Sequence, residues 1–163
     1  MEFKIEPTSA ENLLDRCALL MSQSEPWITL NRELEHCKEA MRGDYKEVYV
    51  ATEDGRLYGF IVLQMAGVFK GYIQSIFVTP EARGAGLGSA LIQFAEERIF
   101  SVSPNVFMLV SAFNDRAAQL YLRLGYEKIG TLRNFVIEGY DELLLRKTIG
   151  SLNNFEPHRH KDS

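Results

Sequence analysis

Residues 76–91 read Ile-Phe-Val-Thr-Pro-Glu-Ala-Arg-Gly-Ala-Gly-Leu-Gly-Ser-Ala-Leu, and this stretch decides the fold. A β-rich run ends at Pro80, glycines follow at positions 84, 86 and 88, and a helical pattern comes next. Glycine lacks a Cβ atom, so the backbone can take positive φ and approach a ligand closely. Free N–H groups at the start of a helix, together with the positive end of its dipole, bind anions. The stretch therefore predicts a phosphate-binding loop, although an ordinary glycine-rich turn would have the same composition.

The spacing of the glycines distinguishes between the known kinds of phosphate-binding loop. A dinucleotide-binding G-x-G-x-x-G motif would place its third glycine at position 89, where the chain has Ser89. A Walker-type loop would need a lysine before its Ser or Thr, and no lysine lies in this stretch. The chain instead has Arg83-x-x-Gly86-x-Gly88 directly after the Ile-Phe-Val-Thr-Pro run. This order resembles the coenzyme A pyrophosphate loop of the GNAT N-acetyltransferase superfamily, whose pattern is Gln/Arg-x-x-Gly-x-Gly/Ala.

A second motif supports the same resemblance. The chain carries Asn114-x-x-Ala117-x-x-x-Tyr121-x-x-x-Gly125-Tyr126, which is similar to the second GNAT motif. With their strands, the two motifs cover about residues 71–130. The resemblance implies an α+β fold with a central, mixed and mostly antiparallel sheet of seven strands. The fourth and fifth strands would be parallel, and about four helices would flank the sheet.

Periodicity independently predicts strands alternating with helices. Asp54-Gly55 is a β-hairpin signal between two apolar runs. Residues 71–78, 87–99 and 106–112 read as strand, helix and buried strand, a crossover that makes the two strands parallel. A further helix is expected over residues 31–42. Strict alternation in the strand at 71–78 would divide its side chains between two faces, with Tyr72, Gln74, Ile76 and Val78 on one and Ile73, Ser75 and Phe77 on the other.

Length and charge limit the classes of function. A chain of 163 residues suits one domain, expected over residues 1–149 and followed by a polar tail over 150–163. The net charge of −4, from 18 basic and 22 acidic residues, argues against nucleic-acid binding, which requires a basic surface. It is compatible with a cationic substrate such as an amine. The N-terminus has no apolar signal segment, and no apolar run approaches the ~20 residues that span a bilayer, so we expect a cytoplasmic protein without membrane association.

The cysteines and histidines do not predict a metal centre. Cys17 and Cys37 have neither a disulfide framework nor metal-ligand spacing. His158 and His160 could bind a metal ion, but two histidines without further ligands are more typical of a solvated tail. We therefore expect no metal cofactor.

The resemblance implies direct transfer of an acetyl group from acetyl-CoA to an amine. In this family the fourth and fifth strands part at one end, and the pantetheine arm of the cofactor pairs with the fourth strand there. The amides of the glycine loop bind the pyrophosphate. The residues implied to bind acetyl-CoA are Ile76, Phe77, Val78, Arg83, Gly84, Ala85, Gly86, Leu87, Gly88, Ser89, Asn114 and Tyr121.

The chemistry of amide formation sets three requirements. The attacking amine must lose its proton, because an alkylammonium has no lone pair. The developing oxyanion needs a backbone N–H donor, expected from residues 76–78. The departing thiolate needs a proton, and a phenol with a reference pKa of about 10 is protonated at pH 7 and can donate it. Tyr121 matches the family's tyrosine acid by motif position, although its spacing would also fit a core aromatic residue.

The general base is not evident in the motifs. The strands at 71–78 and 106–112 contain no carboxylate. A water relay could serve, or one of four peripheral carboxylates: Glu25, Glu33, Asp141 and Glu142. Asp141 and Glu142 would lie near the mouth of the slot if the last two strands border it, but exposed charges at a strand end are the alternative.

Acceptor contacts are expected from several segments. In this family the region between the first two helices often walls the acceptor site, which implies contacts from Glu25 and Trp27. A tryptophan that seals the edge of the core is the alternative. The full set of candidate acceptor contacts is Glu25, Trp27, Tyr72, Gln74, Tyr140 and Asp141.

These observations predict an acetyl-CoA-dependent N-acetyltransferase that acts on a primary amine of a small molecule or a peptide, with Tyr121 as general acid. A homodimer is an expectation at the level of the family. The alternative from another class is a noncatalytic acyl-CoA-binding or sensory module that kept the glycine loop. The lack of an evident base is what favours that alternative.

Overall fold

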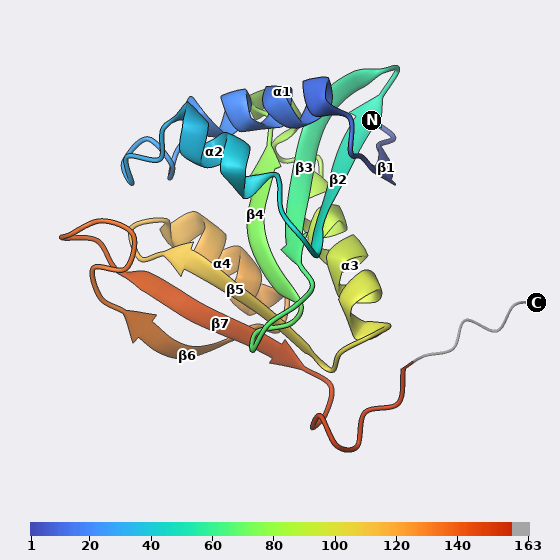
Figure 1. Ribbon diagram of the computed structural model, residues 1–163, viewed down its shortest axis with the longest axis vertical. Coiled ribbons are helices and arrows are strands. Elements are labelled where there is room, and N and C mark those ends of the chain that lie inside the picture. Colours follow the sequence, from blue (N-terminus) through green and yellow to red (C-terminus); the bar gives the residue numbers. More distant parts are fainter. Residues whose placement is uncertain (158–163) are drawn as a thin grey trace, which may run out of the picture.

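The computed structural model describes residues 1–157 (Figure 1). His158 and His160 lie outside the described residues. Strands and helices follow in the order β1 Lys4–Pro7, α1 Glu11–Ser22, α2 Leu34–Ala40, β2 Lys46–Glu53, β3 Arg56–Gln64, β4 Tyr72–Val78, the 3₁₀ helix η1 Pro80–Ala82, α3 Leu87–Phe100, β5 Asn105–Ser111, α4 Asp115–Arg123, β6 Glu127–Leu132 and β7 Glu142–Thr148.

One seven-stranded sheet runs in the order β1-β2-β3-β4-β5-β7-β6. Only β4 and β5 pair in parallel within it, and the other five pairings are antiparallel. This confirms the expected α+β fold. Helices α1 and α2 pack on one face, where Cys17 and Cys37 lie in a core with Phe60 of β3. Helix α3 packs on the other face, where Leu91 lies in a core with Ile61 of β3.

The sheet forks between β4 and β5. The two strands pair only at Tyr72 with Phe107 and at Ile73 with Met108, and beyond these pairs they diverge (Figure 1). Gly71 lies at the closed end, with φ of 87°, and its carbonyl accepts a hydrogen bond from the N–H of Phe107 at 3.0 Å. A Cβ atom there would lie 2.6 Å from the carbonyl oxygen of Asn105, so glycine allows β4 and β5 to approach closely at this point.

A β-bulge at Gln74 changes the faces that strict alternation assigned to β4. Ser75 pairs with Val62 of β3, whereas Ile73 pairs with Leu63, so Gln74 is the extra residue. Ile73, Ile76 and Val78 pack with the core of α3, and Phe77 with that of α1 and α2. The Gln74 side chain donates to the carbonyl of Ala40 in α2 at 3.5 Å. The expected division of faces was therefore wrong, because an inserted residue reverses the alternation beyond it.

The second helix is shorter than the expected span of 31–42. It covers Leu34–Ala40 only, because Asn31 has φ of 52° and the preceding residues form turns. Glu33 is the N-cap of α2, and its N–H donates to Nδ1 of His36 at 3.3 Å. The segment between α1 and α2 is consequently a folded turn region that stands beside the fork (Figure 1).

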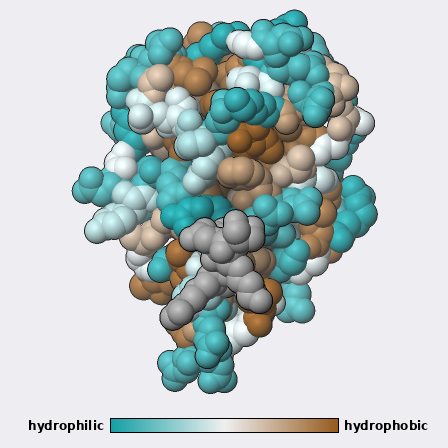
Figure 2. Space-filling model, turned by 90° about the vertical axis from the view of Figure 1, so that its right-hand side faces the viewer, coloured by the Kyte–Doolittle hydropathy of each residue, from teal (hydrophilic) through white to brown (hydrophobic). Residues whose placement is uncertain are grey.

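The outer surface carries no sign of a membrane span within residues 1–157, since no helix there is both long and apolar enough to cross a bilayer. On the side of the molecule where α3 lies, hydrophilic residues cover most of the surface and hydrophobic residues form patches between them (Figure 2).

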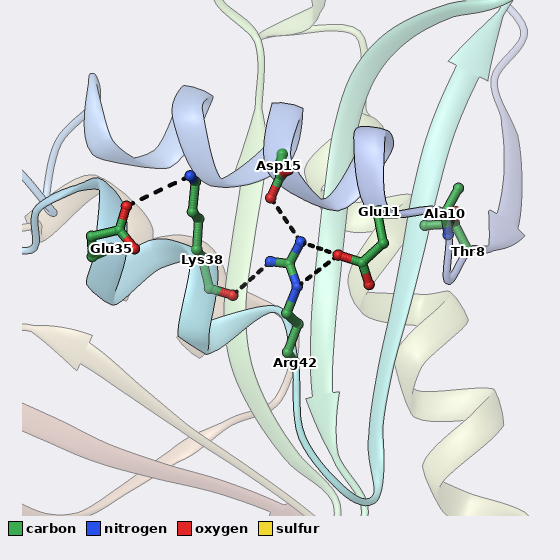
Figure 3. Close-up of polar contacts among 7 residues, drawn as sticks. All are labelled: Thr8, Ala10, Glu11, Asp15, Glu35, Lys38 and Arg42. Atoms are coloured by element: carbon green, nitrogen blue, oxygen red, sulfur yellow. Dashed lines mark hydrogen bonds and ion pairs between the residues drawn. The ribbon is translucent and has the colours of Figure 1, made fainter.

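Arg42 joins α1 to the end of α2. Its guanidinium donates to Glu11 at 2.7 and 3.1 Å and to Asp15 at 2.7 Å, and also to the carbonyl of Lys38 at 2.9 Å (Figure 3). These hydrogen bonds raise the pKa of the Arg42 guanidinium. Charge-assisted hydrogen bonds to several acceptors at once hold a side chain in one geometry. Arg42 thus fixes the two helices that cover one face of the sheet.

We expect Arg42→Gln to lower the free energy of unfolding by about 1 kcal/mol, because the two carboxylates lose a partner that is only partly exposed. For a chain of this size that corresponds to a fall in Tm of about 2–4 °C. Thermal unfolding followed by circular dichroism measures it. Arg16→Gln is the matched control, since Arg16 lies on the exposed side of α1. Equal Tm values for the two variants would contradict this role of Arg42.

Candidate active site

The glycine loop links η1 to α3. Gly84 and Gly86 have φ of 82° and 81°, in the left-handed region, and Gly86 is the N-cap of α3. A Cβ atom at either glycine would meet no atom within 4 Å. The backbone conformation, rather than crowding within the chain, is therefore what favours glycine at these two positions. The space next to the Cα atoms of these two glycines is open.

The start of α3 presents a row of free donors. Ala85 donates its N–H to the carbonyl of Ala82, and Ala90 donates to that of Gly86. Between residues 1 and 157, no acceptor is bonded to the N–H groups of five loop and first-turn residues: Gly84, Gly86, Leu87, Gly88 and Ser89. Unpaired N–H groups at a helix start, next to the positive end of its dipole, fit an anion such as a pyrophosphate.

Arg83 lies beside this row of donors. Its side chain is exposed, and its Nε donates to the carbonyl of Val78 at 3.4 Å. The guanidinium is thus held at the end of β4, next to the loop, where it adds positive charge.

The fork exposes one edge of β4 next to the loop. Thr79 donates its N–H to Tyr58 on the β3 side, and the antiparallel alternation then turns the backbone of Phe77 toward β3 as well. The N–H and C=O groups of Ile76 and Val78 face the open fork. The Phe77 side chain packs in the core, with ring centroids 5.4 Å from Phe60 and 6.4 Å from Trp27. Ile76 and Val78, rather than Phe77, therefore offer their backbone to an extended ligand.

A cavity of about 880 Å³ fills the fork. It lies between the α1–α2 segment, the diverging strands and the segment that joins β6 to β7. Among the residues that the sequence singled out, those lining it are Trp27, Tyr72, Gln74, Ile76, Asn114, Tyr121 and Glu142. The fork thus brings together residues from both motifs and from the acceptor-side segments.

Tyr121 points from α4 to this cavity. Its side chain is 7% exposed, and burial raises its pKa to about 12. Within the described part of the chain, its hydroxyl has no hydrogen-bond partner. Asn114, also at the cavity, caps α4 by accepting the N–H of Ala117 on its Oδ1 at 3.3 Å. The cap uses the oxygen of Asn114, so its amide NH₂ remains available to a ligand.

Other candidates stand away from the cavity. Glu25 accepts the N–H of Thr29 at 3.2 Å, which closes a turn. Asp141 accepts the N–H of Asn134 at 3.2 Å and thereby closes the segment between β6 and β7. Tyr140 packs edge-on against Phe113 with centroids 5.5 Å apart, and Glu33 caps α2. Glu25, Glu33, Tyr140 and Asp141 are not among the cavity-lining residues.

Of the four carboxylates that the sequence offered as a general base, Glu142 is the one that lines the cavity. It is 4% exposed, so the alternative of an exposed charge at a strand end does not hold for this residue. Ser111 of β5 donates its hydroxyl to Oε1 at 2.8 Å. Burial raises the pKa of Glu142, and the Ser111 hydrogen bond opposes that rise. The apolar run that follows it in β7 was the available signal, because it marks a central strand.

Glu142 also acts electrostatically on Tyr72 of β4. Burial raises the pKa of Tyr72 to about 12, and the negative charge of Glu142 contributes to the rise. A carboxylate and two tyrosines, Tyr72 and Tyr121, therefore share one cavity, which the α1–α2 segment and the β6–β7 segment also line.

Comparisons with known proteins agree with this geometry. A family model described as the acetyltransferase (GNAT) family matches residues 10–126, more than half of the chain. An uncharacterised N-acetyltransferase of Methanocaldococcus jannaschii is 36% identical over 101 residues, which are 61% of this chain and 64%, just under two thirds, of that protein. An N-alpha-acetyltransferase of Sulfurisphaera tokodaii is 29% identical over 126 residues, covering 69% of this chain and 72% of that protein.

A solved structure shares the fold. Arabidopsis thaliana NAA60 in complex with acetyl-CoA superposes with a TM-score of 0.75 at 19% identity, over 92% of this chain and all of that one. The family model matches more than half of the chain, which shows that the chain belongs to the GNAT acetyltransferase family.

Proposed function

We propose that the protein transfers the acetyl group of acetyl-CoA to a primary amine of a small molecule or a peptide. Acetyl-CoA is the cosubstrate. The observation that carries the proposal is the row of five unpaired N–H groups at the start of α3, which continues into the open edge of β4. A long ligand with an anionic end and an amide-containing arm matches this arrangement, in which the N–H groups of the loop lie next to the N–H and C=O groups of the β4 edge.

The donor would be held by backbone groups. The loop amides and the positive end of α3 suit the pyrophosphate, and Arg83 adds charge beside it. The edge groups of Ile76 and Val78 suit the amides of the pantetheine arm, and the amide NH₂ of Asn114 suits an acceptor on it. An edge N–H of β4 would also stabilise the negative charge that develops on the acetyl oxygen.

Tyr121 would act as the general acid. Its hydroxyl is free of partners among residues 1–157 and lies at the cavity. Because its pKa is raised to about 12, it stays protonated at neutral pH and can donate a proton to the departing thiolate.

The acceptor would enter on the side of the α1–α2 segment. Trp27 and Gln74 line that side of the cavity, and Phe135 and Val136 line it from the segment between β6 and β7. Apolar walls around a buried amine site favour an acceptor whose amine stands next to an apolar group. The relative named N-alpha-acetyltransferase makes peptide α-amines the first class to test.

A panel of peptides and small amines, incubated with acetyl-CoA and assayed for free CoA, tests the function. We expect turnover with at least one amine, and a rise in Tm with acetyl-CoA but not with NAD. A protein that binds acetyl-CoA yet acetylates no amine would be a noncatalytic acyl-CoA-binding module instead.

Gly86→Ala tests the glycine loop. A residue with a Cβ atom in the left-handed region costs about 1–2 kcal/mol, so the loop would leave the conformation that aligns its N–H groups. We expect the Kd for acetyl-CoA, measured by calorimetry, to rise about tenfold or more, equivalent to about 1.4 kcal/mol. Gly130→Ala in β6 is the control, because a Cβ atom there meets nothing within 4 Å and its φ is not in the left-handed region. An unchanged Kd for Gly86→Ala would count against the loop as the pyrophosphate site.

Tyr121→Phe tests the acid. We expect kcat to fall by about 100-fold or more, the usual contribution of a general acid, while the Kd for acetyl-CoA stays within about twofold of the wild-type value. Tyr126→Phe is the matched control. Tyr126 is also buried and lies 6.4 Å from Tyr121 between ring centroids, but its hydroxyl contacts Glu96 and does not line the cavity. Similar kcat values for the two variants would exclude Tyr121 as the acid.

The pH dependence provides a separate check on Tyr121. An acid must be protonated to act, and its activity is lost as the pH rises through its pKa. Since that pKa is about 12, Tyr121 should stay protonated between pH 7 and 10. We therefore expect kcat of the wild type to show no fall in this range that is due to Tyr121. A fall of kcat near pH 8 that Tyr121→Phe abolishes would instead give Tyr121 a pKa far below 12, and a fall that persists in Tyr121→Phe would mean that another group donates the proton.

A further inference from the structure

We propose that Glu142, positioned by Ser111 at the cavity in the fork, binds the ammonium group of the acceptor and removes its proton. This inference rests on the proposed transfer to an amine. It assigns the one chemical role that the two motifs leave open.

The charge balance of the interior points to this residue. Three carboxylates stand out for their low exposure, and two of them have a cation as partner. Glu47 bonds to Arg98 at 2.8 Å, and Glu96 bonds to Lys147 at 2.9 Å. Glu142 is the most buried of the three, and no lysine, arginine or histidine of residues 1–157 lies within ion-pair distance of it. A buried carboxylate without a cationic partner is costly, and an ammonium ion in the cavity would supply one.

The hydrogen bonds of Glu142 leave one oxygen available. Ser111 donates to Oε1, whereas Oε2 has no donor within the described part of the chain. The residue lies between two neighbouring strands, opposite Ser111 of β5 and Leu132 of β6, so its backbone cannot move away. The fixed carboxylate thus presents Oε2 to whatever enters the cavity.

The charged and titratable surroundings of this carboxylate are few. Ser111 contacts it from β5, and Tyr72 senses its charge from β4. Tyr121 of α4 lines the same cavity. The other charged or titratable residues that line it stand on the acceptor side, namely Arg32, His36, Cys37, Glu39 and Lys46.

The step balances in atoms and charge. The Glu142 carboxylate takes one proton from the ammonium group. The freed lone pair of nitrogen forms the C–N bond with the acetyl carbonyl carbon, and the C–S bond breaks. Tyr121 protonates the sulfur, the second nitrogen proton restores Tyr121, and Glu142 releases its proton to water. Burial raises the pKa of Glu142, which brings it closer to that of an amine and makes it a better base.

Glu142→Gln is the direct test, with an acceptor on which the wild type turns over. We expect kcat/KM at pH 7 to fall by about 100-fold or more, with the Kd for acetyl-CoA within twofold of wild type. The deficit should shrink as the assay pH approaches the pKa of the acceptor, because the amine then arrives already deprotonated. Glu138→Gln is the control, since Glu138 is an exposed carboxylate in the segment before β7. A Glu142→Gln variant as active as Glu138→Gln would overturn the role.

Ser111→Ala gives a second, independent readout, which also decides the matter if Glu142→Gln does not fold. Without the Ser111 hydrogen bond, the pKa of Glu142 should be higher. A base must be deprotonated to act, so the acidic limb of the kcat/KM profile should move to higher pH. A purely structural role for Ser111 would lower activity equally at every pH and would overturn the proposal. If the wild type acetylates no amine, the proposed function fails together with this inference. If the wild type acetylates an amine and the Glu142 and Ser111 variants match its activity and pH profile, this inference alone fails.

Discussion

The parting of β4 from β5 after two residue pairs is the constraint on which the rest of this structure depends. A regular parallel pair would satisfy the edge of β4 along its whole length. Here Gly71 brings the strands together at one end, and the bulge at Gln74 follows at once. Beyond it, within residues 1–157, the backbone groups of Ile76 and the N–H of Val78 remain unpaired, while the carbonyl of Val78 accepts a hydrogen bond from Arg83. The cavity and the open edge of β4 both follow from this one separation.

Unpaired backbone groups in two neighbouring places give the fork its chemical character. A strand edge and a helix start that lack partners within residues 1–157 can both bond to a ligand in place of water. Gly84 and Gly86 have positive φ, and their N–H groups donate to no acceptor within residues 1–157. A ligand with an anionic end and an amide-containing arm satisfies both sets at once, which is why the donor side reads as a single continuous site.

Charge in the interior separates structural from functional residues. Glu47 with Arg98 ties β2 to α3, and Glu96 with Lys147 ties α3 to β7. In these pairs the attraction between partners offsets the loss of hydration. Glu142 is as firmly placed as they are, but its only bonded partner among residues 1–157 is a hydroxyl group. The same physical rule that makes the first two pairs part of the fold makes Glu142 a site for a cation that comes from outside.

By itself, the sequence determined the features that depend only on residues close together in the chain. The glycine loop, the Asp54-Gly55 hairpin and the parallel crossover follow from allowed φ values and from the periods of strands and helices. Tertiary structure decided the rest. The bulge at Gln74 depends on the register with β3, and the burial of Glu142 depends on its pairing with Ser111, which is 31 residues away in the chain. No local pattern encodes which strand will lie beside β7, so a carboxylate that looked like a surface charge became buried at the cavity only when the sheet was assembled.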